Sequence, residues 1–265
     1  MLDVIRAEFR RLLATRMWVV ALVVAALIGG GLIGALALVG PENFTPPMPG
    51  LDTEPGIRSV LGIVGFTAFV PAALGTVAMA SEYRHRTIAV TFLFAPRRWQ
   101  VLTAKLVAYG VAGLAYGIVL AGTGALGLFG AAALRGVSLG LPVGTVLVLV
   151  ARIGVAMVAY LLLGVAAGAL LRNQIAALAV VVGYLYLGET LLMMIPGVNL
   201  AYPFLPGGAT AALTNYTYLA DAMAEQLATR PVHLLSPVAG ALLMLAYTLV
   251  ASAVAVLVPL RRDVT

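Results

Sequence analysis

Long apolar runs, separated by short basic or proline-containing stretches, make up most of this chain of 265 residues. The hydrocarbon core of a bilayer is about 30 Å thick, so a helix that spans it needs roughly 20 apolar residues. Six runs meet this requirement. We expect them to span a membrane at residues 17–39, 57–80, 105–130, 143–171, 176–195 and 238–258.

The composition excludes a soluble fold. Apolar residues make up 62% of the chain and charged residues 10%, whereas soluble domains hold about 45–50% and 25%. We therefore predict an all-α integral membrane protein with one transmembrane domain over residues 1–265. The run 17–39 is too long for the apolar part of a cleavable signal peptide, so we expect it to be a permanent helix. Since the chain has no cysteine, disulfides and thiolate metal sites are excluded.

The basic residues predict the orientation. With six spans both termini lie on one side, and twelve of the sixteen basic residues fall there, against three on the other side. Because basic residues favour the cytoplasmic side of a membrane, we expect both termini to be cytoplasmic. The net charge of +6 then lies at the membrane edges, so we expect no nucleic-acid partner. A composition with 15 arginines and one lysine suggests the cytoplasmic membrane of a bacterium.

The segment 1–16 precedes the first span and has the pattern of an amphipathic helix lying in the membrane interface. Its apolar face holds Leu2, Ile5, Phe9, Leu12 and Leu13. Its charged residues, mostly off that face, are Asp3, Arg6, Arg10 and Arg11. Two interpretations stay open: a charged anchor for the first span, or a contact surface for a cytoplasmic partner.

The cytoplasmic connection at residues 81–100 is longer than a simple turn between two helices requires. It contains a charged turn, an apolar stretch and a second basic turn before Lys105, the one lysine of the chain. The residues that mark the two turns are Glu82, Arg84, Arg86, Thr87, Pro96, Arg97 and Arg98. This layout predicts a segment at the membrane surface that a soluble partner could grip. Glu82 could equally cap a helix or pair with a nearby arginine.

The outer segment 198–237 is semi-polar and contains several helix-breaking residues. Pro203, Pro206, Gly207 and Gly208 interrupt any long helix there, and residues 218–228 could form a short outer helix. An ordinary surface loop is the alternative interpretation.

Two ionisable residues lie within the expected spans, Arg152 in the fourth and Glu189 in the fifth. A charge at bilayer depth usually faces the interior of a helix bundle and finds a partner. The two residues lie at similar depths on consecutive antiparallel spans. We therefore expect them to face each other or a common polar cavity, unless Arg152 extends to the outer interface and Glu189 lies at a wetter helix end.

These motifs together resemble the permeases of type 2 ABC exporters. The likeness lies in the amphipathic N-terminal helix, the stretch Glu82-x-x-x-x-Thr87, the turn Pro96-Arg97-Arg98, and Lys105 at the next span. It implies that Glu82 to Trp99 forms a coupling segment that docks on an ATPase. It further implies that the N-terminal helix, through Phe9 and Arg10, contacts the same ATPase, and that 198–237 is a partly re-entrant cap.

The resemblance also implies the partners. The chain lacks a phosphate-binding G-x-x-x-x-G-K-[ST] loop, because Leu106 follows its only lysine. We therefore expect no enzymatic activity and no cofactor in this chain, with ATP and Mg²⁺ bound by separate ABC ATPase subunits. A second permease chain, identical or related, is implied, with membrane lipid around the pair.

The expected function is export of a hydrophobic or amphipathic substrate, such as a lipid, a drug or a peptide. Two alternatives stay open. One is a non-transporting membrane subunit with an immunity or sensory role. The other is an intramembrane enzyme, for which the spans offer only Arg152 and Glu189 as ionisable groups.

Overall fold

Six continuous helical stretches form the body of this protein, whose structure is a computed structural model. The structure describes residues 1–45, 47–85, 87, 91, 97–171, 173–195, 197–216 and 233–257, and within them there is no strand. The stretches long and apolar enough to span a membrane are Met17–Val39, Glu54–Arg84, Arg98–Arg135, Val143–Leu171, Gln174–Met193 and Pro237–Leu257. This confirms the all-helical class and six helices of membrane-spanning length.

Three of the six spans change helix type partway along their length. The first consists of α2 (Met17–Ala26), the π-helix η1 (Leu27–Ile33) and α3 (Gly34–Val39). The second consists of α4 (Glu54–Ile63), the 3-10 helix η3 (Val64–Ala68) and α5 (Phe69–Arg84). The fifth consists of α9 (Gln174–Gly183), the π-helix η4 (Tyr184–Gly188) and α10 (Glu189–Met193).

The other three spans are uninterrupted α-helices, and shorter elements flank them. The spans are α7 (Arg98–Arg135), α8 (Val143–Leu171) and α13 (Pro237–Leu257). The flanking elements are α1 (Leu2–Ala14), η2 (Pro41–Asn43), η5 (Val198–Phe204) and α11 (Pro206–Thr214). α7 extends beyond the expected 105–130 at both ends, because basic residues at its ends are also helical.

Local sequence signals set several of the helix ends. The Thr53 hydroxyl accepts a hydrogen bond from the Gly56 amide, 3.2 Å away, and so caps α4. The Asn173 side chain caps α9 by accepting hydrogen bonds from the amides of Ile175 and Ala176. α7 ends at Arg135, and the following Gly136 caps it with a φ of 65°, in the left-handed region that glycine adopts without strain.

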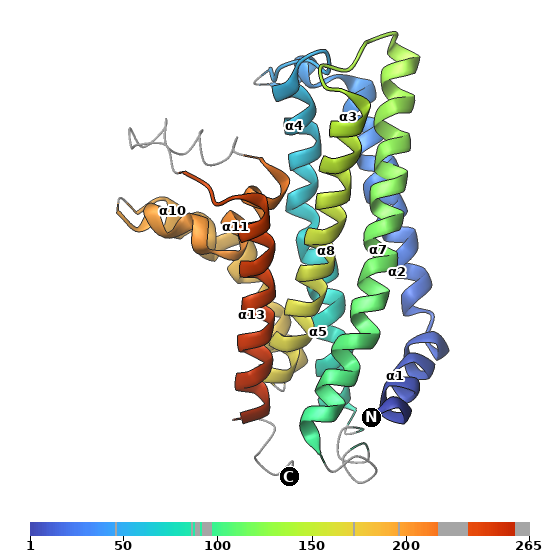
Figure 1. The fold of residues 1–265 in the computed structure, drawn as a ribbon, viewed down its shortest axis with the longest axis vertical. Helices are drawn as coiled ribbons and strands as arrows, with labels where there is room; N and C mark the ends of the chain where they lie inside the picture. The colour runs from blue at the N-terminus through green and yellow to red at the C-terminus, as the bar shows by residue number, and fades with distance from the viewer. Residues whose placement is uncertain are drawn as a thin grey trace.

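The spans stand side by side, with α1 lying at one end of the bundle. The first, second, third and fourth spans are grouped together, and α13 stands beside α8 (Figure 1). The end of α13 at Leu257 lies at the same end of the bundle as α1 (Figure 1). We call this the α1 end, and the opposite end, where η2 lies, the η2 end.

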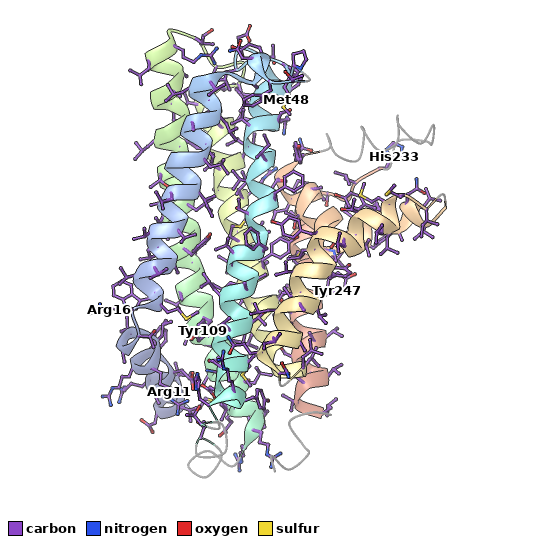
Figure 2. All side chains as sticks on the ribbon, turned by 180° about the vertical axis from the view of Figure 1, so that it is seen from behind. Arg11, Arg16, Met48, Tyr109, His233 and Tyr247 are labelled. Carbon is purple, nitrogen blue, oxygen red and sulfur yellow. The ribbon has the colours of Figure 1, made fainter. Side chains whose placement is uncertain are left out.

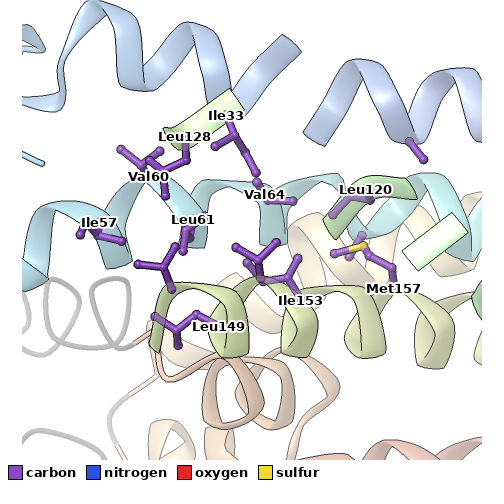
Figure 3. Packing of buried hydrophobic residues seen from close by; sticks show 14 of the residues in the cluster. Ile33, Ile57, Val60, Leu61, Val64, Leu120, Leu128, Leu149, Ile153 and Met157 are labelled. Atoms are coloured by element: carbon purple, nitrogen blue, oxygen red, sulfur yellow. The ribbon is translucent and has the colours of Figure 1, made fainter. Parts of the chain in front are cut away.

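The apolar core lies between the first four spans. Figure 3 shows Ile33, Val60, Leu120 and Ile153, one from each span, converging in its centre. Close helix contacts through glycine surround this core. A Cβ atom added to Gly75 of α5 would lie 2.0 Å from the Leu161 carbonyl oxygen of α8. Such contacts need a residue without a side chain, as expected for helix packing inside a membrane.

Glycines of several spans lie where two helices touch. Gly34 of the first span meets Gly127 of α7, and Gly117 of α7 meets Gly154 of α8. Gly164, with Gly168 one turn later, packs against the α5 backbone. Each of these glycines lets two helix backbones approach closely.

The fifth span and α11 depart from the upright arrangement. α10 turns away from the bundle axis and projects sideways (Figure 1). α11 then returns and packs against α13 and α8. The hydroxyl oxygens of Thr210 in α11 and Tyr160, in the middle of α8, lie 3.0 Å apart. The predicted short helix at 218–228 lies outside the described residues.

Candidate functional site

A buried cluster of charged side chains joins three helices at the α1 end of the bundle. The Lys105 Nζ of α7 donates hydrogen bonds to Glu8 Oε2 of α1, at 2.7 Å, and to Glu82 Oε1 of α5, at 2.8 Å. Lys105 is 1% exposed, Glu8 2% and Glu82 9%. The ammonium group also lies 5.5 Å from the centre of the Tyr109 ring, within range of a cation–π interaction.

Arg11 of α1 completes the cluster from its outer side. Its guanidinium lies 3.2 Å from Glu8 Oε1 and 3.2 Å from Glu82 Oε1, and it donates a 3.0 Å hydrogen bond to the Thr91 hydroxyl. Two carboxylates and two cations give the cluster a formal charge of zero. Figure 2 places Arg11 and Tyr109 close to each other at the α1 end, with Met48 at the opposite end.

The position of Glu8 on α1 explains how a surface helix enters this cluster. Ile5, Phe9 and Leu12 are half-buried, and Glu8, the most buried residue of α1, lies on the same face. The predicted apolar face is therefore correct in its centre, but it has an acid in the middle. Leu2 and Leu13, which we assigned to that face, are exposed.

The cluster makes the three helices mechanically dependent on one another. Removing one partner from a buried ion pair leaves an uncompensated charge, which costs about 3–5 kcal/mol. α1 therefore cannot separate from α5 and α7 without exposing or stranding these charges. Thr87 and Thr91 extend the network into the connection after α5, since the Thr87 hydroxyl donates to the Glu82 carbonyl oxygen and the Thr91 hydroxyl to that of Thr87.

The residues predicted for the 81–100 segment fall into two groups. Glu82 lies inside the buried cluster, whereas Arg84, Thr87 and Arg97 are exposed and Arg98 is half-buried. Arg84 also donates a 3.4 Å hydrogen bond to the Gln174 side chain at the start of α9. Arg86 and Pro96 lie outside the described residues.

The two predicted residues of the N-terminal helix do not form the cluster themselves. Phe9 packs in an apolar pocket with Tyr109 and Tyr116 of α7, and Arg10 is exposed. Their neighbours form it instead: Glu8 accepts hydrogen bonds from Lys105 and Arg11, and Arg11 also donates to Glu82. The sequence did not predict either role. The signal that could have revealed them is an acid on the apolar face of α1 with an arginine three residues later.

The structure does not join Arg152 and Glu189 as an ion pair. The Glu189 carboxylate accepts hydrogen bonds from the Gly207 amide, with distances of 2.7 and 3.0 Å to its two oxygens. Arg152 lines a separate pocket with Arg58 and Asn215, towards the N-terminal end of α8. Glu189 thus takes a donor from the start of α11 and none from Arg152.

At the η2 end a second ion pair closes the bundle. The Arg135 guanidinium, at the end of α7, donates to the Glu42 carboxylate and to the Ala37 carbonyl oxygen. A hydrogen bond from the backbone amide of Glu42 lowers the pKa of its carboxyl, desolvation opposes this effect, and Arg135 lowers the pKa further. This pair holds the first span to the third at the end opposite the buried cluster.

Together, the six long apolar helices and the surface helix tied to two of them have the build of a multi-pass membrane protein. No model of a known protein family matches the sequence, and neither does any curated protein.

Proposed function

We propose that this chain is the membrane-spanning permease subunit of an ATP-driven exporter, with ATP hydrolysis on separate subunits. The observation that carries this proposal is the buried cluster of Glu8, Arg11, Glu82 and Lys105. It fixes α1, which lies outside the spans, to the end of the second span and to the first turns of the third.

Such a connection suits a subunit that receives force from outside the membrane. A soluble partner that pushed on α1 or on the connection after α5 would displace both spans together, because the cluster resists separation. The exposed basic side chains Arg84 and Arg97 flank this connection along the chain, and the exposed Arg10 precedes Arg11 of the cluster on α1. They provide charged contacts for an acidic docking surface, and such charges act on association rate and specificity.

The proposal also includes an orientation of the chain in the membrane and a position of α11 within it. We place the α1 end in the cytoplasm of a bacterium, following the distribution of basic residues. Tyr160 lies 17 positions after Val143, so at 1.5 Å per residue the contact with Thr210 is about 25 Å along α8 from its outer end. α11 would then lie at membrane depth as a re-entrant element that shields the pathway.

A second permease chain is part of the proposal. Only 11% of the most apolar part of the fifth span is buried within the chain, so most of this helix is left for lipid or another subunit. The substrate, a hydrophobic or amphipathic molecule, would move between the paired chains along the second and fifth spans.

Purification from native membranes tests the proposal. The tagged chain is extracted in mild detergent, its companions are identified by mass spectrometry, and the eluate is assayed for ATP hydrolysis. We expect a protein with a phosphate-binding loop to co-purify, and Arg10→Glu combined with Arg97→Glu to release it. Asp52→Lys, a charge change on an exposed residue next to α4, is the control. A chain that emerges with no ATPase would contradict the proposal.

A further inference from the structure

A cavity of about 140 Å³ lies between the second, fourth and fifth spans and α11. Its walls are mainly apolar and aromatic. The aromatic side chains that line it are Phe66, Phe69, Tyr160, Tyr186, Tyr202 and Tyr216. The one ionisable acid or base among its lining residues, apart from tyrosines, is Glu189. Small binding sites in proteins typically combine such an apolar wall with a few placed polar groups.

The charge of Glu189 is not balanced within the part of the chain that the structure describes. Glu189 is 5% exposed, and the donors that reach its carboxylate are the Gly207 amide and the Tyr184 hydroxyl. Both are neutral groups. Among the described residues no lysine, arginine or histidine forms an ion pair with Glu189, and Arg152 lines a different pocket. A buried carboxylate without a counterion is costly, so the cavity favours a positively charged occupant.

The approach of Gly207 to Glu189 shows that the carboxylate is held in place. A Cβ atom on Gly207 would lie 2.0 Å from Glu189 Oε2, so with any other residue there the carboxylate would have to move from this position. The amide belongs to the first turn of α11, whose dipole also favours a negative group. The Gly207 amide therefore holds the carboxylate by hydrogen bonds at the cavity wall.

The aromatic side chains suit the apolar part of a cationic ligand. Cations bind the faces of tyrosine and phenylalanine rings, and quaternary ammonium groups are recognised by cages of such rings. The ring of Tyr216 fits against the second span because Gly62 lacks a side chain, and a Cβ atom there would lie 2.1 Å from the ring. A carboxylate surrounded by rings is the combination that an organic ammonium ion requires.

The mouth of the cavity lies between the second and fifth spans. Phe66, Tyr186 and Thr190 line the cavity and are also exposed. The Tyr186 hydroxyl donates a 2.7 Å hydrogen bond to the Phe66 carbonyl oxygen, and the Tyr186 and Phe69 rings lie 5.6 Å apart. Phe66 belongs to a 3-10 segment. This contact joins the two spans at the exposed edge of the cavity.

We infer that this cavity binds a small hydrophobic organic cation, with Glu189 as its counterion and the surrounding rings as its apolar wall. The claim that such cations are the exported substrate rests on the proposed function. The claim that the cavity binds them concerns this chain alone. The lateral mouth suits molecules that partition into the membrane before they bind.

Binding of benzyltrimethylammonium to the purified full-length chain in lipid nanodiscs tests the inference. The comparison ligand is neopentylbenzene, which has the same shape with carbon in place of the charged nitrogen. Titration calorimetry should give at least tenfold tighter binding of the cation. Glu189→Gln should remove this preference, because glutamine keeps an oxygen for the Gly207 amide but carries no charge. Asp52→Asn, the same change at an exposed acid outside the cavity, should preserve it.

Three results would overturn the inference. They are equal affinity for the two ligands, a cation preference that survives Glu189→Gln, and Glu189-dependent binding of sodium alone. If Glu189→Gln does not fold, the affinities of the two ligands for the wild-type chain still test the inference, because equal affinities would overturn it. If the chain does not prefer the cation but an ATPase co-purifies with it, only the inferred substrate class is refuted. If the chain binds the cation but no ATPase co-purifies with it, the exporter function is refuted and the cation-binding site stands.

Discussion

The Nζ of Lys105 lies 2.7 Å from Glu8 Oε2, although 97 positions of the chain separate the two residues. Lys105 occupies the second turn of a span and Glu8 the middle of a surface helix. Their contact, shared with Glu82, turns three helices into one unit at the α1 end. The stability and the proposed action of the protein both depend on this unit.

Replacing Lys105 tests the cluster by stability. Lys105→Met leaves Glu8 and Glu82 buried without the ammonium, so we expect the free energy of unfolding to fall by about 3–5 kcal/mol. Denaturation in mixed detergent micelles measures this loss. Arg97→Met, at an exposed arginine before the same helix, should stay within about 0.5 kcal/mol of the wild type.

An apolar replacement of the whole group provides a further check on the cluster. Because well-packed apolar residues often substitute for buried ion pairs without loss, combining Lys105→Met with Glu8→Leu and Glu82→Leu should restore most of the stability. If Lys105→Met alone proved as stable as the wild type, the cluster could not be the anchor of α1.

Two glycines of α7 should respond oppositely to the same substitution. A Cβ atom on Gly117 would lie 2.6 Å from the Gly154 carbonyl oxygen, while at Gly122 it would meet nothing within 4 Å. Gly117→Ala should therefore destabilise the protein by about 1–3 kcal/mol through overpacking. Gly122→Ala should stabilise it by about 0.5–1 kcal/mol, since alanine favours a helix over glycine. Similar effects at both positions would contradict the packing of α7 on α8.

The Glu42–Arg135 pair should make stability depend on acidic pH. Since the pKa of Glu42 is lower in the folded protein than its ordinary value, the pair stabilises the fold above that ordinary value. The stabilisation should disappear as the pH falls through the lowered pKa. Melting temperatures should therefore be higher for the wild type than for Glu42→Gln at pH 7 and should converge in acid. A difference that stayed constant down to pH 2 would show that ionisation of Glu42 plays no part.

The proposed orientation is open to direct labelling, because the chain has no cysteine. A single cysteine replacing Asp52 should react in intact cells with a maleimide that cannot cross membranes. A cysteine replacing Arg10 should react only after the membrane is opened. Both positions are exposed, so burial does not confuse the result. The reverse pattern would place the α1 end outside the cell.

The sequence predicted the number and approximate position of the long apolar helices, because span length and hydrophobicity are local properties of the chain. It also singled out Glu82, whose role in coupling to an ATPase stays a prediction. The sequence did not predict contacts between residues that are far apart in the chain. The contact of Glu8 with Lys105 depends on where α1 lies against α7. The hydrogen bond from Gly207 to Glu189 forms because α11 returns to the bundle. We expected Arg152 and Glu189 to face each other or a common polar cavity, but they line different pockets. Similar depth therefore does not determine which way two side chains point.

The central claim is that a soluble ATPase docks beside the buried cluster. Site-specific cross-linking in native membranes tests it most directly, using a single cysteine in place of Arg97 that carries a photoreactive group. We predict that the cross-linked product contains a protein with a phosphate-binding loop, and that the same group in place of Asp52 does not capture it. Capture of lipid alone, or the same proteins from both positions, would contradict the claim.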